Sequence, residues 1–184
     1  MKKVFIASVV VLIYACNSAE KSPAETETNP VVPVQAVISN MSGYEAAYSK
    51  SFEMGDPKNA ETVLALWKDW DNGNLQTSKA LFADSVSILT SDGSVIAGVR
   101  DSVMASMQGY RDNFSAIKSS VDAIFPIKSS DKNEQWVCIW GRETNTDKKG
   151  KTDSVFLQET WRFNNNGKID LLLQQARVLK PAKK

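Results

Sequence analysis

The sequence predicts an α+β domain in which helical segments come first along the chain and an antiparallel sheet follows. Two observations lead to this prediction. Residues 57–70 place apolar side chains at helical spacing, whereas residues 121–179 form short strand-like segments separated by turn signals. Because helices followed by a run of strands are typical of this class, we expect the helices to pack on one face of a curved sheet.

The best-defined helix is expected over residues 57–70. Asp56 precedes Pro57, so a capping carboxylate is followed by a proline whose missing N–H costs no helical hydrogen bond. The Asp-Asn-Gly-Asn segment at 71–74 ends the helix. One face carries its apolar residues, which are Ala60, Val63, Leu64, Trp67 and Trp70.

Three other segments also have helical spacing. The aromatic residues of 44–52 recur every four positions, so a helix is expected to begin there. A short helix is predicted over 75–82, with Asn74 as its cap. A longer helix is predicted to open at Asp101, with one side made of Val103, Met107, Tyr110 and Phe114.

The other segments are predicted to be strands. An Asp-Gly pair at 92–93 and an Asn-Gly pair at 166–167 are typical of tight hairpins, and polar turns occupy 129–133 and 147–150. The expected strands are 86–90, 95–97, 121–127, 135–144, 155–163 and 169–179. We expect the last four to pair as an antiparallel meander.

The first sixteen residues predict export and lipid anchoring. Lys2 and Lys3 precede an apolar run at 4–15, which is typical of a secretory signal and too short to span a bilayer. Cys16 follows in an Ile-Tyr-Ala-Cys segment that resembles a bacterial lipobox. We therefore expect a lipidated Cys16 to anchor the protein to the membrane of the cell envelope, with the outer membrane as the expected location. An ordinary signal peptide with an incidental thiol is the alternative.

The chain is predicted to divide into three parts. Residues 1–15 form the signal peptide, residues 16–40 a disordered tether rich in Ser, Thr, Glu and Pro, and residues 41–184 the domain. Removal of the signal leaves 20 Lys and Arg against 21 Asp and Glu, a formal charge of −1. This charge argues against nucleic acid as a partner, because phosphates require a basic patch.

Histidine is absent from the sequence, which excludes several kinds of site. Acyl-transfer triads that use histidine and histidine-ligated metal centres cannot form, and we expect neither a metal nor a cofactor. If Cys16 carries lipid, Cys138 has no partner for an intramolecular disulfide. Any acid–base chemistry must come from Asp, Glu, Lys or Tyr.

Several short motifs occur in a characteristic order. They are Trp-Asp-Asn-Gly-Asn-Leu at 70–75, Leu-Phe-Ala-Asp-Ser-Val at 81–86, Ile-Ala-Gly-Val-Arg-Asp at 96–101, Trp-Arg-Phe at 161–163 and Asn-Gly-Lys-Ile at 166–169. This ordered set resembles the SnoaL-like branch of the nuclear transport factor 2-like (NTF2-like) superfamily over about residues 57–178. The resemblance implies a cone-shaped α+β barrel in which three N-terminal helices and a curved antiparallel sheet enclose a pocket.

The resemblance does not by itself choose a function. The superfamily includes polyketide cyclases, ketosteroid isomerase, limonene epoxide hydrolase, scytalone dehydratase and catalytically silent binding domains. SnoaL-like cyclases often carry a histidine and an aspartate on the last strand. The corresponding segment here, 171–175, reads Leu-Leu-Leu-Gln-Gln and has neither.

Glu159 is the first candidate site residue. Because strand residues alternate between faces, Glu159 shares a face with Leu157 and Trp161. A carboxyl between those side chains is expected to have a raised pKa unless it is paired, and a carboxyl tuned toward neutrality suits acid–base catalysis. Two alternatives stay open: this face is the outer one, or Glu159 pairs with Arg142 on the adjoining strand.

Asp84 and Gln174 are further candidates. Asp84 stands where the resembling family places a polar pocket group, and the alternative is a turn aspartate. Gln174 shares a face with Leu172 and Ala176 and is expected to form a hydrogen bond with a ligand. The alternative is that its amide forms hydrogen bonds with backbone groups. Five tryptophans are expected to line the pocket or to fill the core: Trp67, Trp70, Trp136, Trp140 and Trp161.

Three functions remain open at this point. The first is a lipid-anchored domain that binds a small apolar molecule in a tryptophan-lined pocket without turnover. The second is an isomerase- or cyclase-type enzyme with Asp84 or Glu159 as general base. The third is a structural module that forms a homodimer through the open sheet face. The missing histidine and the apolar last strand favour the first or third function, and we predict the first.

Overall fold

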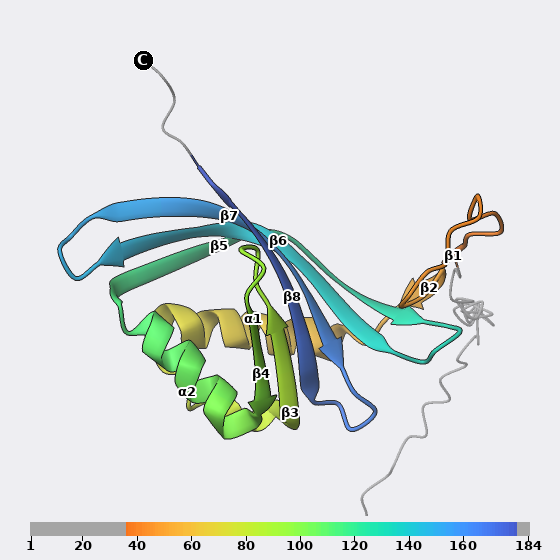
Figure 1. Ribbon diagram of the computed structural model, residues 1–184, viewed down its shortest axis with the longest axis horizontal. Helices are drawn as coiled ribbons and strands as arrows, with labels where there is room; N and C mark the ends of the chain where they lie inside the picture. Colours follow the sequence, from red (N-terminus) through yellow and green to blue (C-terminus); the bar gives the residue numbers. More distant parts are fainter. Residues whose placement is uncertain (1–35, 180–184) are drawn as a thin grey trace, which may run out of the picture. The chain divides into compact units, whose positions relative to one another are not determined.

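The computed structural model describes residues 36–179. The predicted signal peptide, Cys16 and almost all of the predicted tether therefore lie outside the described residues. Within them, an eight-stranded sheet has the order β1-β2-β5-β6-β7-β8-β3-β4, and two helices lie on the inner side of its curve (Figure 1). No helix of this part of the chain is long and apolar enough to cross a membrane.

Eight strands, two α-helices and one short 3-10 turn make up the described fold. The strands are β1 Ala36–Val37, β2 Ser51–Met54, β3 Phe82–Leu89, β4 Val95–Val99, β5 Phe114–Ser129, β6 Gln135–Asp147, β7 Thr152–Phe163 and β8 Ile169–Val178. The helices are α1 Pro57–Asn72 and α2 Arg100–Arg111, and the 3-10 turn is η1 Lys79–Leu81. The α+β class and the curved sheet with helices on one face are confirmed, and the sheet stays open.

Helix α1 forms as its sequence predicts. The Asp56 side chain accepts a hydrogen bond of 2.9 Å from the Lys58 N–H, which caps the first turn. Gly73 ends the helix with a φ of 74°, a left-handed conformation that glycine adopts without strain. Val63 and Trp67 on the predicted face are buried, but Leu64 is 38% exposed and lies at its edge.

Two of the predicted helices are wrong. Residues 44–52 form no helix, and Phe52 instead pairs with Ser129 in the β2–β5 ladder. In the segment 75–82 only η1 is helical, and Phe82 already belongs to β3. Tertiary contacts override local propensity there, because the Gln108 side chain accepts from the Leu75 N–H at 3.1 Å. The described residues thus contain two α-helices where the resemblance implied three.

Most strands are longer than their apolar patterns predict, whereas β8 ends one residue earlier than predicted. Strand β5 begins at Phe114, separated by two residues from the end of α2, because pairing with β6 continues along its whole length. Strand β3 pairs with β4 in the predicted hairpin, but it also pairs in parallel with β8, where Ile88 lies opposite Leu172. The sheet is therefore mixed, whereas β5 to β8 form the expected antiparallel meander.

The inner face of the sheet is opposite to the tryptophan-rich face of β6. Val137 and Ile139 are fully buried on the inner face, whereas Trp140 on the outer face is 37% exposed. The inner face continues across β7 and β8, because Glu159 of β7 lies opposite Ile139 of β6 and also opposite Gln174 of β8. The hydrophobic core is therefore packed between this face and the helices.

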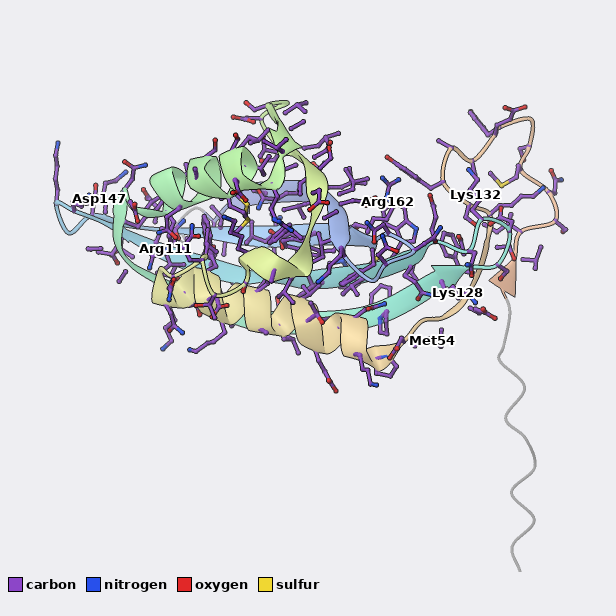
Figure 2. The ribbon with its side chains drawn as sticks, turned by 90° about the horizontal axis from the view of Figure 1, so that it is seen from below. Met54, Arg111, Lys128, Lys132, Asp147 and Arg162 are labelled. Carbon is purple, nitrogen blue, oxygen red and sulfur yellow. The ribbon has the colours of Figure 1, made fainter. Side chains whose placement is uncertain are left out.

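Arg111 connects the C-terminal ends of the two helices (Figure 2). It is 6% exposed, and its guanidinium donates to the carbonyls of Trp70 at 2.7 Å, Asp71 at 2.9 Å and Phe114 at 3.0 Å. Carbonyls at a helix C-terminus carry partial negative charge, so a buried cation is stabilised there without a carboxylate partner.

Gly141 lets α1 approach the sheet closely. A Cβ atom at this position would lie 2.2 Å from the Ser120 carbonyl oxygen and 2.9 Å from a ring carbon of Trp67. The register of β5 against β6 also shifts between Val121 and Ala123, opposite this glycine. The Trp67 ring therefore lies directly against the backbone of β6.

We expect Gly141→Ala to destabilise the fold by about 3 kcal/mol, the upper end of the usual cost of overpacking, because backbone as well as the Trp67 ring must move. Gly109→Ala is the matched control, since nothing lies within 4 Å of its added Cβ and alanine favours the helix interior. Urea titration should show the control at or above the wild-type stability. A Gly141→Ala variant as stable as the wild type would contradict this packing.

Candidate functional site

A pocket of about 550 Å³ lies between the inner sheet face, the two helices and the β3–β4 hairpin. Its apolar walls are Leu66, Trp67, Trp70, Leu75, Ile88, Ile96, Met107, Tyr110, Val155, Leu157, Trp161, Leu172 and Ala176. Its polar lining residues are Thr90, Ser91, Asp92, Ser94, Glu143, Asn145, Glu159 and Gln174. The site is thus a mostly apolar cavity with a few polar groups.

Glu159 is 4% exposed and is held by three side-chain N–H donors. The indole groups of Trp67 and Trp161 donate to its Oε2 at 2.8 and 3.1 Å, and the Gln174 amide donates to its Oε1 at 2.8 Å. Burial raises the pKa of Glu159, and these hydrogen bonds lower it in part. All three donors are neutral, so the carboxyl is solvated by the protein without a cation.

Glu143 is a second buried carboxyl of the pocket, 8% exposed. The Trp70 indole donates to its Oε2 at 2.6 Å. Burial raises its pKa, while hydrogen bonds from Asn145 and Trp70 lower it in part. Sequence reasoning missed Glu143, because alternation places it on the same face of β6 as Gly141 but does not say that this face is the inner one.

An aromatic pair lies beside Glu143. The rings of Trp70 and Tyr110 stack with centroids 6.2 Å apart at an interplanar angle of 15°. Burial raises the pKa of the Tyr110 hydroxyl, and the nearby Glu143 raises it further. The phenol therefore stays protonated at neutral pH and adds a neutral wall to this end of the pocket.

The tip of the β3–β4 hairpin supplies a third carboxyl. Asp92 accepts from the Thr90 hydroxyl at 2.5 Å and from the Ser94 N–H at 2.9 Å, which fixes the turn. These hydrogen bonds lower the pKa of Asp92, so this exposed carboxyl is ionised at neutral pH.

The structure brings five of the predicted site residues together. They are Trp67, Trp70, Glu159, Trp161 and Gln174, all of which line the pocket. The predicted alternative of a pair between Glu159 and Arg142 is wrong, because Arg142 lies on the outer face and its guanidinium faces Asp122 at 3.6 Å.

Two of the predicted pocket tryptophans lie elsewhere. Trp136 and Trp140 belong to the outer face of β6, because they alternate with the inner residues Val137 and Ile139. Trp136 is covered by the Tyr48 ring, with centroids 5.0 Å apart, and Trp140 packs edge-on against Phe125. Neither ring lines the pocket.

Asp84 also lies outside the pocket, contrary to the prediction. Its side chain is 97% exposed and pairs with Arg100 at 3.3 Å. The register of β3 against β8 shifts between Phe82 and Ser87, and Asp84 lies in this irregular stretch, where strict alternation no longer places a side chain. Among residues 36–179 there is also no group of three or more carboxylate or thiol side chains arranged to hold a metal ion.

Solved structures of other proteins share this fold. No family model matches the chain, and no curated protein is similar to it in sequence. A protein of the NTF2-like family from Streptomyces avermitilis superposes with a TM-score of 0.51 at 16% identity, covering 67% of this chain and 99% of that one.

Two further similar structures carry enzyme names. One, from Shewanella denitrificans, is named a SnoaL-like polyketide cyclase and has a TM-score of 0.52 at 12% identity, over 66% of this chain and 92% of that one. The other, from Mycobacterium tuberculosis, is named an epoxide hydrolase similar to limonene epoxide hydrolase. It has a TM-score of 0.52 at 12% identity, over 66% of this chain and 84% of that one. At these identities the likeness establishes the fold alone: the chain has the NTF2-like cone fold.

Proposed function

We propose that the domain binds a small, mostly apolar molecule in the pocket of about 550 Å³. The observation that carries this proposal is one cavity that combines apolar walls with two buried carboxyls, Glu143 and Glu159. A cavity of this size suits a drug-sized ligand, and a few polar groups in an apolar wall fix the orientation of such a ligand.

Binding without turnover fits the bonding of Glu159. Its carboxyl accepts three hydrogen bonds that tie α1, β7 and β8 together. Its neighbour on the last strand is Gln174, whose amide does not ionise near neutral pH and so cannot act as an acid or a base. We therefore assign Glu159 the role of positioning the pocket wall rather than of moving a proton.

An acid–base enzyme is the second candidate. Burial raises the pKa of both Glu143 and Glu159, which brings a carboxyl toward the range useful for proton transfer. Glu143 has fewer protein donors than Glu159, so it replaces the exposed Asp84 as the candidate base. The names of the similar structures, a cyclase and an epoxide hydrolase, support testing for turnover.

We expect native mass spectrometry of the full chain to show a co-purifying small molecule. Ala176→Trp should reduce its occupancy at least tenfold, because Ala176 lines the pocket and a bulky ring fills it. Gln175→Trp is the matched control, since the neighbouring residue on β8 faces the opposite side. Equal occupancy in Ala176→Trp and the wild type would contradict the assignment of this pocket.

The mass of the co-purified ligand, measured again after incubation with the protein, distinguishes a binding domain from an enzyme. After release and re-incubation with the protein, an unaltered mass supports a binding domain. Conversion that is lost in Glu143→Gln would instead establish the acid–base enzyme. The variant keeps the size of the side chain but removes its ability to ionise.

We also propose that Cys16 anchors this domain to the cell envelope through lipid. The support is the order of basic, apolar and small residues before Cys16 at the start of the chain. Two or more acyl chains on one cysteine suffice for stable membrane attachment.

Cys16→Ser should move the protein from the membrane fraction to the soluble fraction on cell fractionation. Cys138→Ser serves as control, because the half-buried Cys138 belongs to β6 in the folded domain. A Cys16→Ser variant that stays in the membrane fraction, or a wild type without lipid mass, would contradict the anchor.

A further inference from the structure

We infer that the pocket selects a hydrophobic cation, a molecule with an apolar body and a protonated amine, and that Glu143 holds the ammonium group. This inference rests on the proposed function, since it names the ligand class of the same pocket. The charges, the hydrogen-bond acceptors and the aromatic rings of the described pocket residues favour such a ligand.

The described lining of the pocket is acidic. It contains three carboxyls, Asp92, Glu143 and Glu159, and neither a lysine nor an arginine. Arg111 lies outside the lining and donates to the carbonyls of Trp70, Asp71 and Phe114, and although its charge lowers the pKa of Glu143 in part, burial still raises that pKa overall. A ligand that brings a positive charge therefore supplies what the lining lacks, whereas an anionic ligand meets repulsion.

The polar groups beside Glu143 are mainly acceptors. The Asn145 Oδ1 atom is buried and has no hydrogen-bond partner among the described residues. Glu143 Oε2 accepts from the Trp70 indole at 2.6 Å, and a carboxylate has acceptor sites for further donors. A buried acceptor without a partner costs free energy, so a ligand that carries N–H donors is favoured here.

Two aromatic rings lie beside the same position. Trp70 and Tyr110 stack with centroids 6.2 Å apart, and both line the pocket together with Glu143. Indole and phenol rings attract cations through their electron-rich faces, and this attraction is modest at an exposed ring such as Tyr110, which is 59% exposed. Carboxylate and rings together form a site suited to an ammonium group.

Glu159 is the less suitable partner for the amine. Its two oxygens already accept three hydrogen bonds. Glu143 lies opposite Val155, whereas Glu159 lies four residues further along β7. This spacing separates their Cα atoms by roughly 13 Å along the strand. The apolar body of the ligand therefore extends from Glu143 toward Leu157 and Leu172.

Three probes with one naphthalene body test the charge preference by isothermal titration of the full chain at neutral pH. They are 1-naphthylmethylamine, 1-naphthylmethanol and 1-naphthoate, which carry a cationic, a neutral and an anionic head group. We expect the amine to bind at least tenfold more tightly than the alcohol, and the carboxylate to bind most weakly.

Glu143→Gln should weaken binding of the amine about tenfold and leave the affinity for the alcohol within about twofold. Glu61→Gln is the matched control, because Glu61 is an exposed residue of α1 outside the pocket, and it should leave all three affinities unchanged. If Glu143→Gln does not fold, the head-group preference of the wild type still decides the question of charge, and Asn145→Ala tests the position.

The outcomes separate the two proposals. Binding of the alcohol or the carboxylate as tightly as the amine would overturn the cation preference while the binding pocket stands. Failure of all three probes to bind would overturn the proposed function and this inference with it. An amine preference that survives both Glu143→Gln and Asn145→Ala would overturn the placement of the ammonium group.

Discussion

The carboxyl of Glu159 is the interaction on which the site depends. It joins Trp67 of α1, Trp161 of β7 and Gln174 of β8, so one side chain links a helix to two strands. A hydrogen bond to a charged group contributes about 1.5–3 kcal/mol, and removal of the carboxyl leaves buried donors without partners. Gly141 makes this link possible, because only a residue without a Cβ leaves room for the Trp67 ring.

A second link of the same kind joins Trp70 to Glu143 on β6. Trp67 and Trp70 are three residues apart and so lie on the same side of α1, from which each reaches a carboxyl on the inner sheet face. The helix is thus attached to the sheet by polar contacts as well as by apolar packing. Among the described residues neither carboxyl forms a direct ion pair with a lysine or arginine, and the lining contains none, so the wall of the pocket is acidic and the proposed ligand is a cation.

Much of the fold could be predicted from local sequence patterns. The cap at Asp56, the helical face of α1 and the meander from β5 to β8 follow from spacing and turn residues alone. The parallel pairing of β3 with β8 and the turn at 75–78 could not be predicted, because they depend on contacts between distant segments. Alternation places Glu159 and Trp161 on one face of β7, but it does not say which face of β6 is covered by the helices. The helices pack on the face opposite to Trp136 and Trp140, and Glu143 belongs to that covered face. Its place in the pocket could therefore not be predicted from the sequence.

The most direct test of this account is a pH titration of the five indole N–H groups by ¹H–¹⁵N NMR. Because Glu159 accepts from Trp67 and Trp161, both indole resonances should report its ionisation, with a midpoint above the usual carboxyl value of 4.5. Glu159→Gln should abolish that titration, and the outer-face Trp140 should not show it in either protein. Indole signals of Trp67 and Trp161 that do not titrate, or that titrate at or below 4.5, would contradict the buried carboxyl at the centre of the site.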